Sequence, residues 1–203
     1  MRANRLFDAI VQFSARPART AIPYGKEDAV RQLNLLTSKP VLYVCNVEEA
    51  SAASGNAFSQ AVMEKAKAEG ARAVVVSAAI EAEVSLLPEA DRAEFLEGLG
   101  LADSGLDRVI RAGYELLGLL TYFTCGPKET HAWTITKGTL APQAAAVIHK
   151  DFERGFIAAE TIGYDDYVAC RGEARAKETG KMRIEGKTYP VKDGDVMLFR
   201  FNV

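Results

Sequence analysis

Two short apolar runs on either side of a helical pattern limit what this chain of 203 residues can fold into. Residues 41–45 and 73–76 are continuously apolar, which predicts strands that are covered on both faces. Between them, residues 57–69 show the apolar spacing of a helix, with a candidate cap at residues 54–56 and a stop at Gly70. A strand, a helix and a second strand in this order predict a βαβ unit with two parallel strands.

Two strands are too few for an independent parallel sheet, because such a sheet needs cover on both faces and neighbours at its edges. We therefore interpret residues 39–117 as the C-terminal part of a larger doubly wound α/β domain. Residues 1–38 contain a short helical pattern that is broken at Pro17 and Pro23, and they are interpreted as a helical fragment with a linker. The open strand edge of such a chain predicts self-association.

Two further helices are predicted after the second strand, at residues 88–97 and 105–117. Asp103 or Ser104 is a candidate N-cap for the second of them. A domain boundary is expected near Gly118, where the helical period ends. The apolar stripe of the second helix consists of Leu106, Val109, Ile110, Gly113 and Leu117.

Residues 118–203 show the pattern of short strands around one helix, which predicts a small α+β domain of the β-grasp (ubiquitin-like) kind. The expected strands are residues 119–125, 130–136, 156–164 and 196–201, with a helix from Pro142 to about His149 and a hairpin of residues 181–184 and 187–191.

Composition narrows the class of protein. The net charge is -2 and 48% of the residues are hydrophobic, which are ordinary values for a globular protein. No apolar run approaches the ~18 residues that span a bilayer, so we expect a cytoplasmic protein with no membrane contact. Cys45, Cys125 and Cys170 form no CxxC pair, and the two histidines lie far apart, so neither a disulfide framework nor a metal site is predicted.

Polar residues follow each of the two apolar runs, where doubly wound proteins bind their ligands. Asn46 and Glu49 follow the first run, and an amide with a carboxylate three positions on can recognise the edge of a purine base. The small residues Ser77, Ala78 and Ala79 follow the second run and permit a ligand to approach backbone amides. Taken one at a time, each pattern is also explained by a helix cap and a solvated carboxylate.

These residues belong to longer runs that resemble the Obg-like ATPases of the YchF type, which bind ribosomes. The similarity extends over roughly residues 26–203. The runs that carry it are Lys39–Glu49 (KPVLYVCNVEE), Gly105–Tyr114 (GLDRVIRAGY), Thr121–Thr124 (TYFT), Ala132–Ile135 (AWTI), Ala141–Ala145 (APQAA), His149, Asp151–Ile157 (DFERGFI), Val191–Val196 (VKDGDV) and Phe201–Val203 (FNV).

The resemblance implies three parts. Residues 1–38 correspond to a remnant of an inserted helical, coiled-coil domain with its linker, residues 39–117 to the C-terminal part of a P-loop nucleotide-binding domain, and residues 118–203 to a TGS domain. The full-length family uses ATP or GTP with Mg²⁺. The implied residues that bind the purine base are Asn46, Val47, Glu49, Ser77, Ala78 and Ala79.

The base-binding motif departs from that of related GTPases, which carry Asn-Lys-x-Asp. Glu49 is longer than the Asp that accepts two hydrogen bonds from guanine, and Val47 replaces the Lys that packs on the base. Both changes relax the selection of guanine and imply a preference for ATP over GTP.

The elements that hold phosphate are missing from the sequence. A P-loop needs G-x-x-x-x-G-K-[ST], but the one approximate match, at residues 186–188, has Lys181 where the first glycine belongs. No D-x-x-G occurs either. We therefore expect that this chain by itself neither hydrolyses nucleotide nor binds it tightly.

A basic stretch at residues 171–192 offers a second functional surface, either for RNA through phosphate contacts or simply as a solvated face. Two hypotheses follow: the chain is the C-terminal part of a ribosome-associated ATPase, or it is a non-enzymatic TGS module that binds RNA or the ribosome by itself. The candidate RNA-binding residues are Arg171, Arg175, Lys177, Lys181, Arg183 and Lys187.

Overall fold

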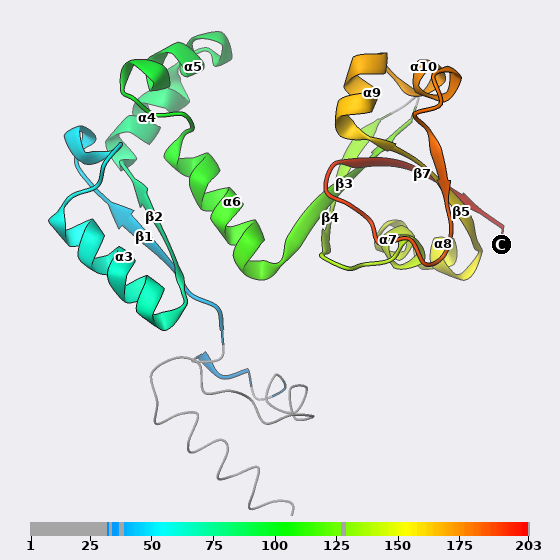
Figure 1. Cartoon of the computed structure of the whole chain (residues 1–203), viewed down its shortest axis with the longest axis horizontal. Coiled ribbons are helices and arrows are strands. Elements are labelled where there is room, and N and C mark those ends of the chain that lie inside the picture. The colour runs from blue at the N-terminus through cyan, green and yellow to red at the C-terminus, as the bar shows by residue number, and fades with distance from the viewer. Residues whose placement is uncertain (1–31, 33, 37–38, 127–128, 203) are drawn as a thin grey trace, which may run out of the picture. The chain divides into compact units, whose positions relative to one another are not determined.

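The computed structural model describes residues 32, 34–36, 39–126 and 129–202. The predicted helical fragment within residues 1–38 lies almost entirely outside the described residues. The chain divides into two compact units, Met1–Leu116 and Leu117–Val203, which are described separately below. Figure 1 labels most of their helices and strands.

The first unit contains the predicted βαβ arrangement. Strands β1 (Leu42–Asn46) and β2 (Arg72–Val76) pair in parallel, and helix α3 (Ala57–Glu69) connects them. The side chain of Asn56 accepts hydrogen bonds from two amides of the first turn of α3, and Gly70 ends the helix in the left-handed conformation with φ of 60°. The two strands, the helix and both of its ends are therefore confirmed.

Three helices follow: α4 (Ala78–Leu86), α5 (Glu89–Gly98) and α6 (Gly105–Leu117). The two helices predicted in this region, α5 and α6, are confirmed. Ser104 caps α6, because its Oγ accepts from the backbone N–H of Asp107 at 3.0 Å. Helix α4 was not predicted, although its cause is visible in the sequence. Ile80 and Val84 lie one turn apart and both are buried in a small core with Leu96 of α5 and Leu101.

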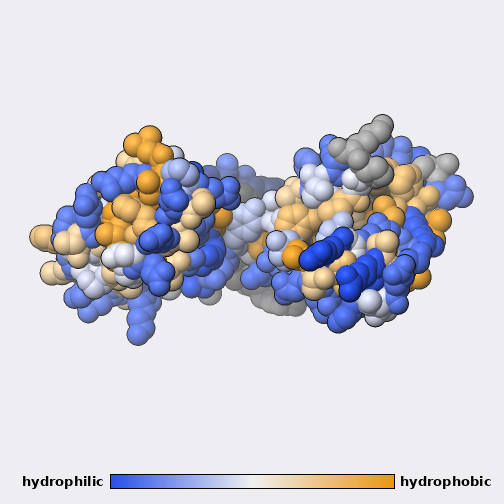
Figure 2. Space-filling model, turned by 90° about the horizontal axis from the view of Figure 1, so that it is seen from above, coloured by the Kyte–Doolittle hydropathy of each residue, from blue (hydrophilic) through white to orange (hydrophobic). Residues whose placement is uncertain are grey.

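The apolar stripe of α6 is largely uncovered. Leu106, Ile110 and Leu117 expose 59%, 48% and 57% of their surface, and Val44 in the middle of β1 exposes 50%. Apolar side chains are visible at the surface of the first unit, on the left in Figure 2. The first unit therefore has apolar surface on both a helix and a strand that its described residues do not cover.

The second unit is a five-stranded mixed sheet with the order β4-β3-β7-β5-β6. Strand β3 pairs with β7 in parallel, whereas β3 with β4, β5 with β6 and β5 with β7 pair in antiparallel orientation. The elements of this unit are β3 (Leu119–Cys125), β4 (Thr130–Thr136), α7 (Ala141–Ile148), α8 (Lys150–Arg154), β5 (Phe156–Gly163), α9 (Tyr164–Cys170), α10 (Glu173–Glu178), β6 (Arg183–Glu185) and β7 (Asp195–Phe201).

Helix α7 packs on one face of this sheet and forms the main core with it. Tyr122 of β3 is fully buried, and its hydroxyl donates to the backbone carbonyl of Ala144 at 2.9 Å. Its ring meets the ring of Phe199 edge to face at 5.9 Å. Because its buried hydroxyl has a hydrogen-bond partner on α7, Tyr122 avoids the cost of an unpaired polar group. The same bond holds α7 on the sheet.

The predicted hairpin near the C-terminus is wrong. Only Arg183–Glu185 forms a strand, and it pairs with β5 instead of with residues 187–191. The reason is that the second half of the expected hairpin contacts α7: the carbonyl of Tyr189 accepts from the N–H of Ala141 at 2.9 Å, and Pro190 forms an isolated bridge with Leu140. Helices α8, α9 and α10 were not predicted.

Among the residues that the structure describes, no helix is both long enough and apolar enough to cross a membrane.

Candidate functional site

The two polar loops that the sequence singled out meet at one edge of the β1–β2 pair. Asn46, the last residue of β1, is in register with Val76, the last residue of β2. The backbone N–H of Val47 then donates to the carbonyl of Val76 at 2.9 Å, which extends the pairing by one more bond. The carboxyl ends of both strands therefore lie side by side.

The side chain of Asn46 links the two loops directly. Its Oδ1 accepts a hydrogen bond from the backbone N–H of Ala78 at 2.9 Å, at the first turn of α4. This bond orients the amide, so its NH₂ group is the part that can donate to a ligand. Ala78 and Ala79 lie in the first turn of α4, and Ser77 precedes it as the N-cap residue.

Ser77 differs from the other polar residues of this group because its side chain is buried. It is 2% exposed, and its Oγ is a buried polar atom that has no hydrogen-bond partner within the described chain. Leaving a buried hydroxyl unpaired costs about 1–3 kcal/mol. An unpaired hydroxyl at the start of a helix, next to an oriented amide, is chemically suited to a polar ligand that supplies the missing partner.

The two glutamates of the first loop have different environments. Glu48 accepts from the hydroxyl of Ser51 and from Nδ2 of Asn56, the latter at 3.2 Å, and the hydrogen bond from Ser51 is the main cause that lowers the pKa of Glu48. Glu49 begins the short 3₁₀ helix η2 (Glu49–Ser51) and is exposed. Its carboxylate has no hydrogen bond or ion pair to any described residue, so it is free to accept from a ligand.

Val47, which was also predicted to contact the purine base, is 8% exposed. Its buried position means that it contributes packing beneath the loop, in addition to the backbone bond to β2. The polar groups that remain available at this edge are therefore the amide of Asn46, the carboxylate of Glu49 and the hydroxyl of Ser77.

Sequence reasoning missed the residue that anchors α4 at this edge. The carboxylate of Glu81 accepts from the backbone N–H groups of Gly105 and Leu106, at 2.6 and 3.2 Å, and so caps α6. A Cβ at Gly105 would lie 2.9 Å from Oε1 of Glu81 and 3.0 Å from Cβ of Val76, which explains the glycine. No local signal could have revealed this contact, because the two partners lie far apart in the sequence.

The structure separates the candidate RNA-binding residues into two groups. Lys181 pairs with Asp166 at 3.0 Å, and that hydrogen bond raises the pKa of Lys181. Arg183 lies 3.5 Å from Asp195, so its charge is also partly compensated. The cations with no ion pair to another described residue are Arg171, Arg175, Lys177 and Lys187, all of them exposed.

Residues 186–188, the approximate P-loop match, follow β6 and lead to the bridge at Pro190 rather than to a helix. This context differs from the strand, loop and helix order of a phosphate-binding loop. Within the described ranges no group of three or more His, Cys, Asp or Glu side chains is placed to hold a metal ion.

Comparisons with known proteins find several that are similar to this chain. The family model described as "YchF-GTPase_C: Protein of unknown function (DUF933)" matches residues 119–202. The protein named ribosome-binding ATPase YchF from Bacillus subtilis is 52% identical over 193 residues, which covers 94% of this chain and 53% of the relative. Its counterpart from Pasteurella multocida is 55% identical over 175 residues, covering 86% of this chain and 48% of the relative.

A solved structure shows the same arrangement of elements. The structure of the Schizosaccharomyces pombe YchF GTPase matches with a TM-score of 0.79 and 31% identity, over 97% of this chain and 53% of that one. The chain spans about half the length of the curated relatives that it matches. Both units are included in these matches, so the chain is similar to YchF proteins over about half of their length.

Proposed function

We propose that residues 39–117 carry the base-recognition end of a purine nucleotide site, and that residues 118–203 form a TGS domain that contacts the ribosome or its RNA. Residues 1–38 are assigned to the end of an inserted helical domain and its linker. In this proposal the chain is the C-terminal part of a cytoplasmic, ribosome-associated ATPase of the YchF type. The observation that supports it most is the hydrogen bond from Ala78 to Asn46, which places an oriented amide beside the unpaired hydroxyl of Ser77.

The free groups suit a purine. The NH₂ group of Asn46 can donate to a ring nitrogen, and Glu49 can accept from an exocyclic amino group. Guanine offers a fork of N1–H and an amino group, which the shorter Asp of related GTPases accepts. Adenine offers a single amino group, which one oxygen of Glu49 satisfies. The site is therefore proposed to prefer ATP over GTP.

The residues present do not fit the phosphates or Mg²⁺. Neither a P-loop nor D-x-x-G occurs in the sequence, and the described residues include no cluster suited to the ion. We assign those contacts to the part of the relatives that this chain does not cover, so no hydrolytic step is attributed to the residues described here.

The sheet order of the second unit supports its assignment as a β-grasp domain of the TGS kind. A hairpin, one helix packed on one face, and a parallel pairing of the first and last strands are all present. The exposed cations Arg171, Arg175, Lys177 and Lys187 are the groups proposed to contact RNA phosphate. A stand-alone, non-enzymatic binding module is the less favoured alternative, because the similarity to full-length relatives includes both units.

Saturation-transfer NMR with adenosine and guanosine monophosphates tests the base site. We expect transfer to the adenine protons in the intact chain, and its loss in Asn46→Ala and Glu49→Gln. Glu64→Gln, which changes an exposed and unpaired carboxylate on α3, is the matched control and should keep the signal. Equal signals from all variants would overturn the base assignment.

Co-sedimentation with purified ribosomes tests the RNA contact separately. Arg175→Glu with Lys177→Glu should release the chain at a lower salt concentration, because each lost phosphate contact reduces the salt slope by about 1. Lys137→Glu, at an exposed cation after β4, should leave the salt dependence unchanged. If the double variant and Lys137→Glu change the salt dependence equally, the cations around α10 do not contact the ribosomal RNA.

A further inference from the structure

The loop between β1 and α3 contains Glu49 of the proposed base site, and a buried residue anchors it on each side. Val47 is 8% exposed, and its backbone N–H donates to the carbonyl of Val76 at 2.9 Å. Ala52 is 3% exposed and lies in the small core of the first unit. None of residues 48–51 between these anchors is buried. The direction of Glu49 therefore depends on hydrogen bonds of this turn rather than on packing.

The turn has two backbone hydrogen bonds of its own. The N–H of Ser51 donates to the carbonyl of Glu48 at 3.0 Å, and the N–H of Ala52 donates to the carbonyl of Glu49 at 3.0 Å. These two bonds form η2, which contains no buried residue. Because the hydrogen-bond geometry of a 3₁₀ turn is poor, η2 needs further contacts to hold Glu49 in one direction.

The carboxylate of Glu48 supplies two such contacts. Its Oε1 accepts from the hydroxyl of Ser51, at the other end of η2. Its Oε2 accepts from Nδ2 of Asn56 at 3.2 Å, eight residues further along the sequence. Hydrogen bonds to an ionised carboxylate are stronger than those between neutral groups. Glu48 thus connects both ends of the turn that contains Glu49, and it joins this turn to α3.

Asn56 is a well-oriented partner, because α3 holds its amide. The Oδ1 of Asn56 accepts from the N–H of Phe58 at 3.1 Å and from the N–H of Ser59 at 3.0 Å. When the oxygen of an amide is held by two donors, the orientation of its NH₂ group is fixed as well. The hydrogen bond from Asn56 to Glu48 therefore ties the turn to the first turn of the helix.

We propose that Glu48 is a positioning residue of the base site, which holds η2 against α3 so that the carboxylate of Glu49 faces the exocyclic amino group of adenine. Glu48 itself is not proposed to contact the base, because its two oxygens already accept from Ser51 and Asn56. The inference rests on the proposed function for its ligand, whereas the hydrogen bonds that support it require no nucleotide.

An exchange of the two side chains tests the contact between Glu48 and Asn56. Asn56→Asp keeps the acceptor that caps α3, since Asp caps helices as well as Asn does, but it places a second carboxylate against Glu48. Glu48→Gln in the same chain restores a donor. Its NH₂ group can donate to the new carboxylate, and its amide oxygen can still accept from Ser51. A role of Asn56 in capping alone predicts no such rescue.

Amide hydrogen exchange of the ligand-free chain, measured by NMR at Ser51 and Ala52, tests how well the turn is held. Glu48→Ala and Asn56→Asp should each accelerate exchange of these two amides at least about threefold. The double variant should return it close to the rate of the unchanged chain, and amides in the middle of α3 should keep their rates throughout. Unchanged rates in Glu48→Ala, or equal rates in Asn56→Asp and the double variant, would overturn the proposal.

A second measurement compares two nucleotides that differ only in the exocyclic amino group, adenosine monophosphate and purine riboside monophosphate. The unchanged chain should prefer adenosine monophosphate, because only this nucleotide offers Glu49 an amino group. Glu48→Ala should reduce the preference about threefold and leave the binding of purine riboside monophosphate nearly unchanged. A general loss of structure would instead weaken both nucleotides equally.

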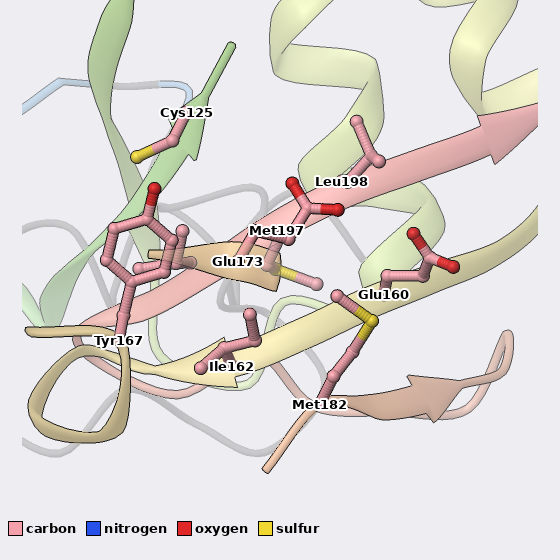
Figure 3. A pocket seen from close by; sticks show the side chains of 9 residues that line it. Cys125, Glu160, Ile162, Tyr167, Glu173, Met182, Met197 and Leu198 are labelled. Carbon is pink, nitrogen blue, oxygen red and sulfur yellow. The ribbon is translucent and has the colours of Figure 1, made fainter. Parts of the chain in front are cut away.

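Glu173→Ala is the matched control. Glu173 borders a small hollow of the second unit (Figure 3) and has no hydrogen bond or ion pair to a described residue. The enclosed volume of the hollow is about 10 Å³, far below the roughly 300–1,000 Å³ of a small-molecule site, so no nucleotide binds there. This variant should change neither the exchange rates of the turn nor the preference between the two nucleotides.

Failure of this proposal and failure of the proposed function give different results. If the unchanged chain does not prefer adenosine monophosphate, the base assignment is wrong and the role of Glu48 in it is refuted as well. If the unchanged chain shows the preference and Glu48→Ala keeps it in full, only the role of Glu48 is refuted and the base assignment stands.

Discussion

The contact between Glu81 and the start of α6 leads to a quantitative prediction. Its carboxylate accepts from two backbone N–H groups, those of Gly105 at 2.6 Å and Leu106 at 3.2 Å. An N-terminal cap is worth about 1 kcal/mol, and a negative charge at a helix N-terminus adds roughly 0.3–1 kcal/mol. The two contributions together give at most about 2 kcal/mol, which is the largest destabilisation of the start of α6 that we expect for Glu81→Ala.

Hydrogen–deuterium exchange of the intact chain measures this loss locally. A change of about 2 kcal/mol corresponds to a roughly 30-fold faster exchange of amides that open with the start of α6. Glu81→Gln keeps one acceptor and loses the charge, so its effect should be about half as large in free energy. Peptides from the five-stranded sheet in the same molecule provide an internal reference.

Glu83→Ala is the matched control for Glu81, because Glu83 lies on the same helix, is exposed and has no hydrogen bond or ion pair to a described residue. Its exchange profile should match that of the unchanged chain. If Glu81→Ala leaves the protection of peptides around Gly105 unchanged, or if Glu83→Ala has the same effect, the cap does not hold α6 and the reasoning is refuted.

Three more predictions concern pH, a helix start and association. Burial, together with a hydrogen bond to Asp195, raises the pKa of Tyr189 to about 12 from 10.0. The folded state thus holds this proton more tightly, so the stability that it contributes is lost as pH rises from about 10 to 12. Base titration followed by fluorescence should show this loss, and Tyr189→Phe should remove that part of the pH dependence. Nδ1 of His149 accepts from the backbone N–H of Asp151 at 3.2 Å, so His149→Ala should lower the free energy of unfolding in urea by about 1 kcal/mol. His149→Asn, which can also cap the helix, should lower it less. Equal losses in the two variants would exclude the capping role. Light scattering of the purified chain should exceed the monomer mass of 22.0 kDa, because the β1–β2 pair has open edges, whereas a monomer would show that these edges are covered.

The parts of the fold that were predicted correctly depend on local patterns. The two apolar runs, helix α3 and the cap at Asn56 follow from the spacing of neighbouring residues. The hairpin near the C-terminus failed because Tyr189 and Pro190 contact the start of α7, which no local pattern reveals. Helix α9 was missed even though Asp165 and Asp166 form an acidic first turn, because the apolar strand β5 runs directly into it.

The contacts at the candidate site could be predicted only in part for the same reason. Asn46, Glu49 and Ser77 were identified from their places after the two strands, and the sequence could not distinguish the roles of neighbouring groups. Glu48 accepts hydrogen bonds from Ser51 and Asn56, whereas Glu49 has no such partner among the described residues, and this difference depends on the path of the loop. The role of Glu81 could not be predicted from a sequence pattern, because its partners are backbone amides of another helix.

The free groups at the proposed base site set an upper limit on the affinity of this chain for ATP. Asn46, Glu49 and Ser77 offer about three hydrogen bonds, each with a net value of roughly 0.5–1.5 kcal/mol. Their sum is at most about 4.5 kcal/mol before any cost of association, which corresponds to a dissociation constant no tighter than about 0.5 mM. Because the bond from Ala78 already orients Asn46 in the absence of ligand, little further ordering is required of that side chain. Calorimetric titration of the chain with ATP should therefore show no saturation in the micromolar range. Micromolar binding would mean that this chain contains phosphate contacts that neither its sequence motifs nor its described residues provide. The proposal that the nucleotide site is divided between this chain and the rest of the relatives' length would then be refuted.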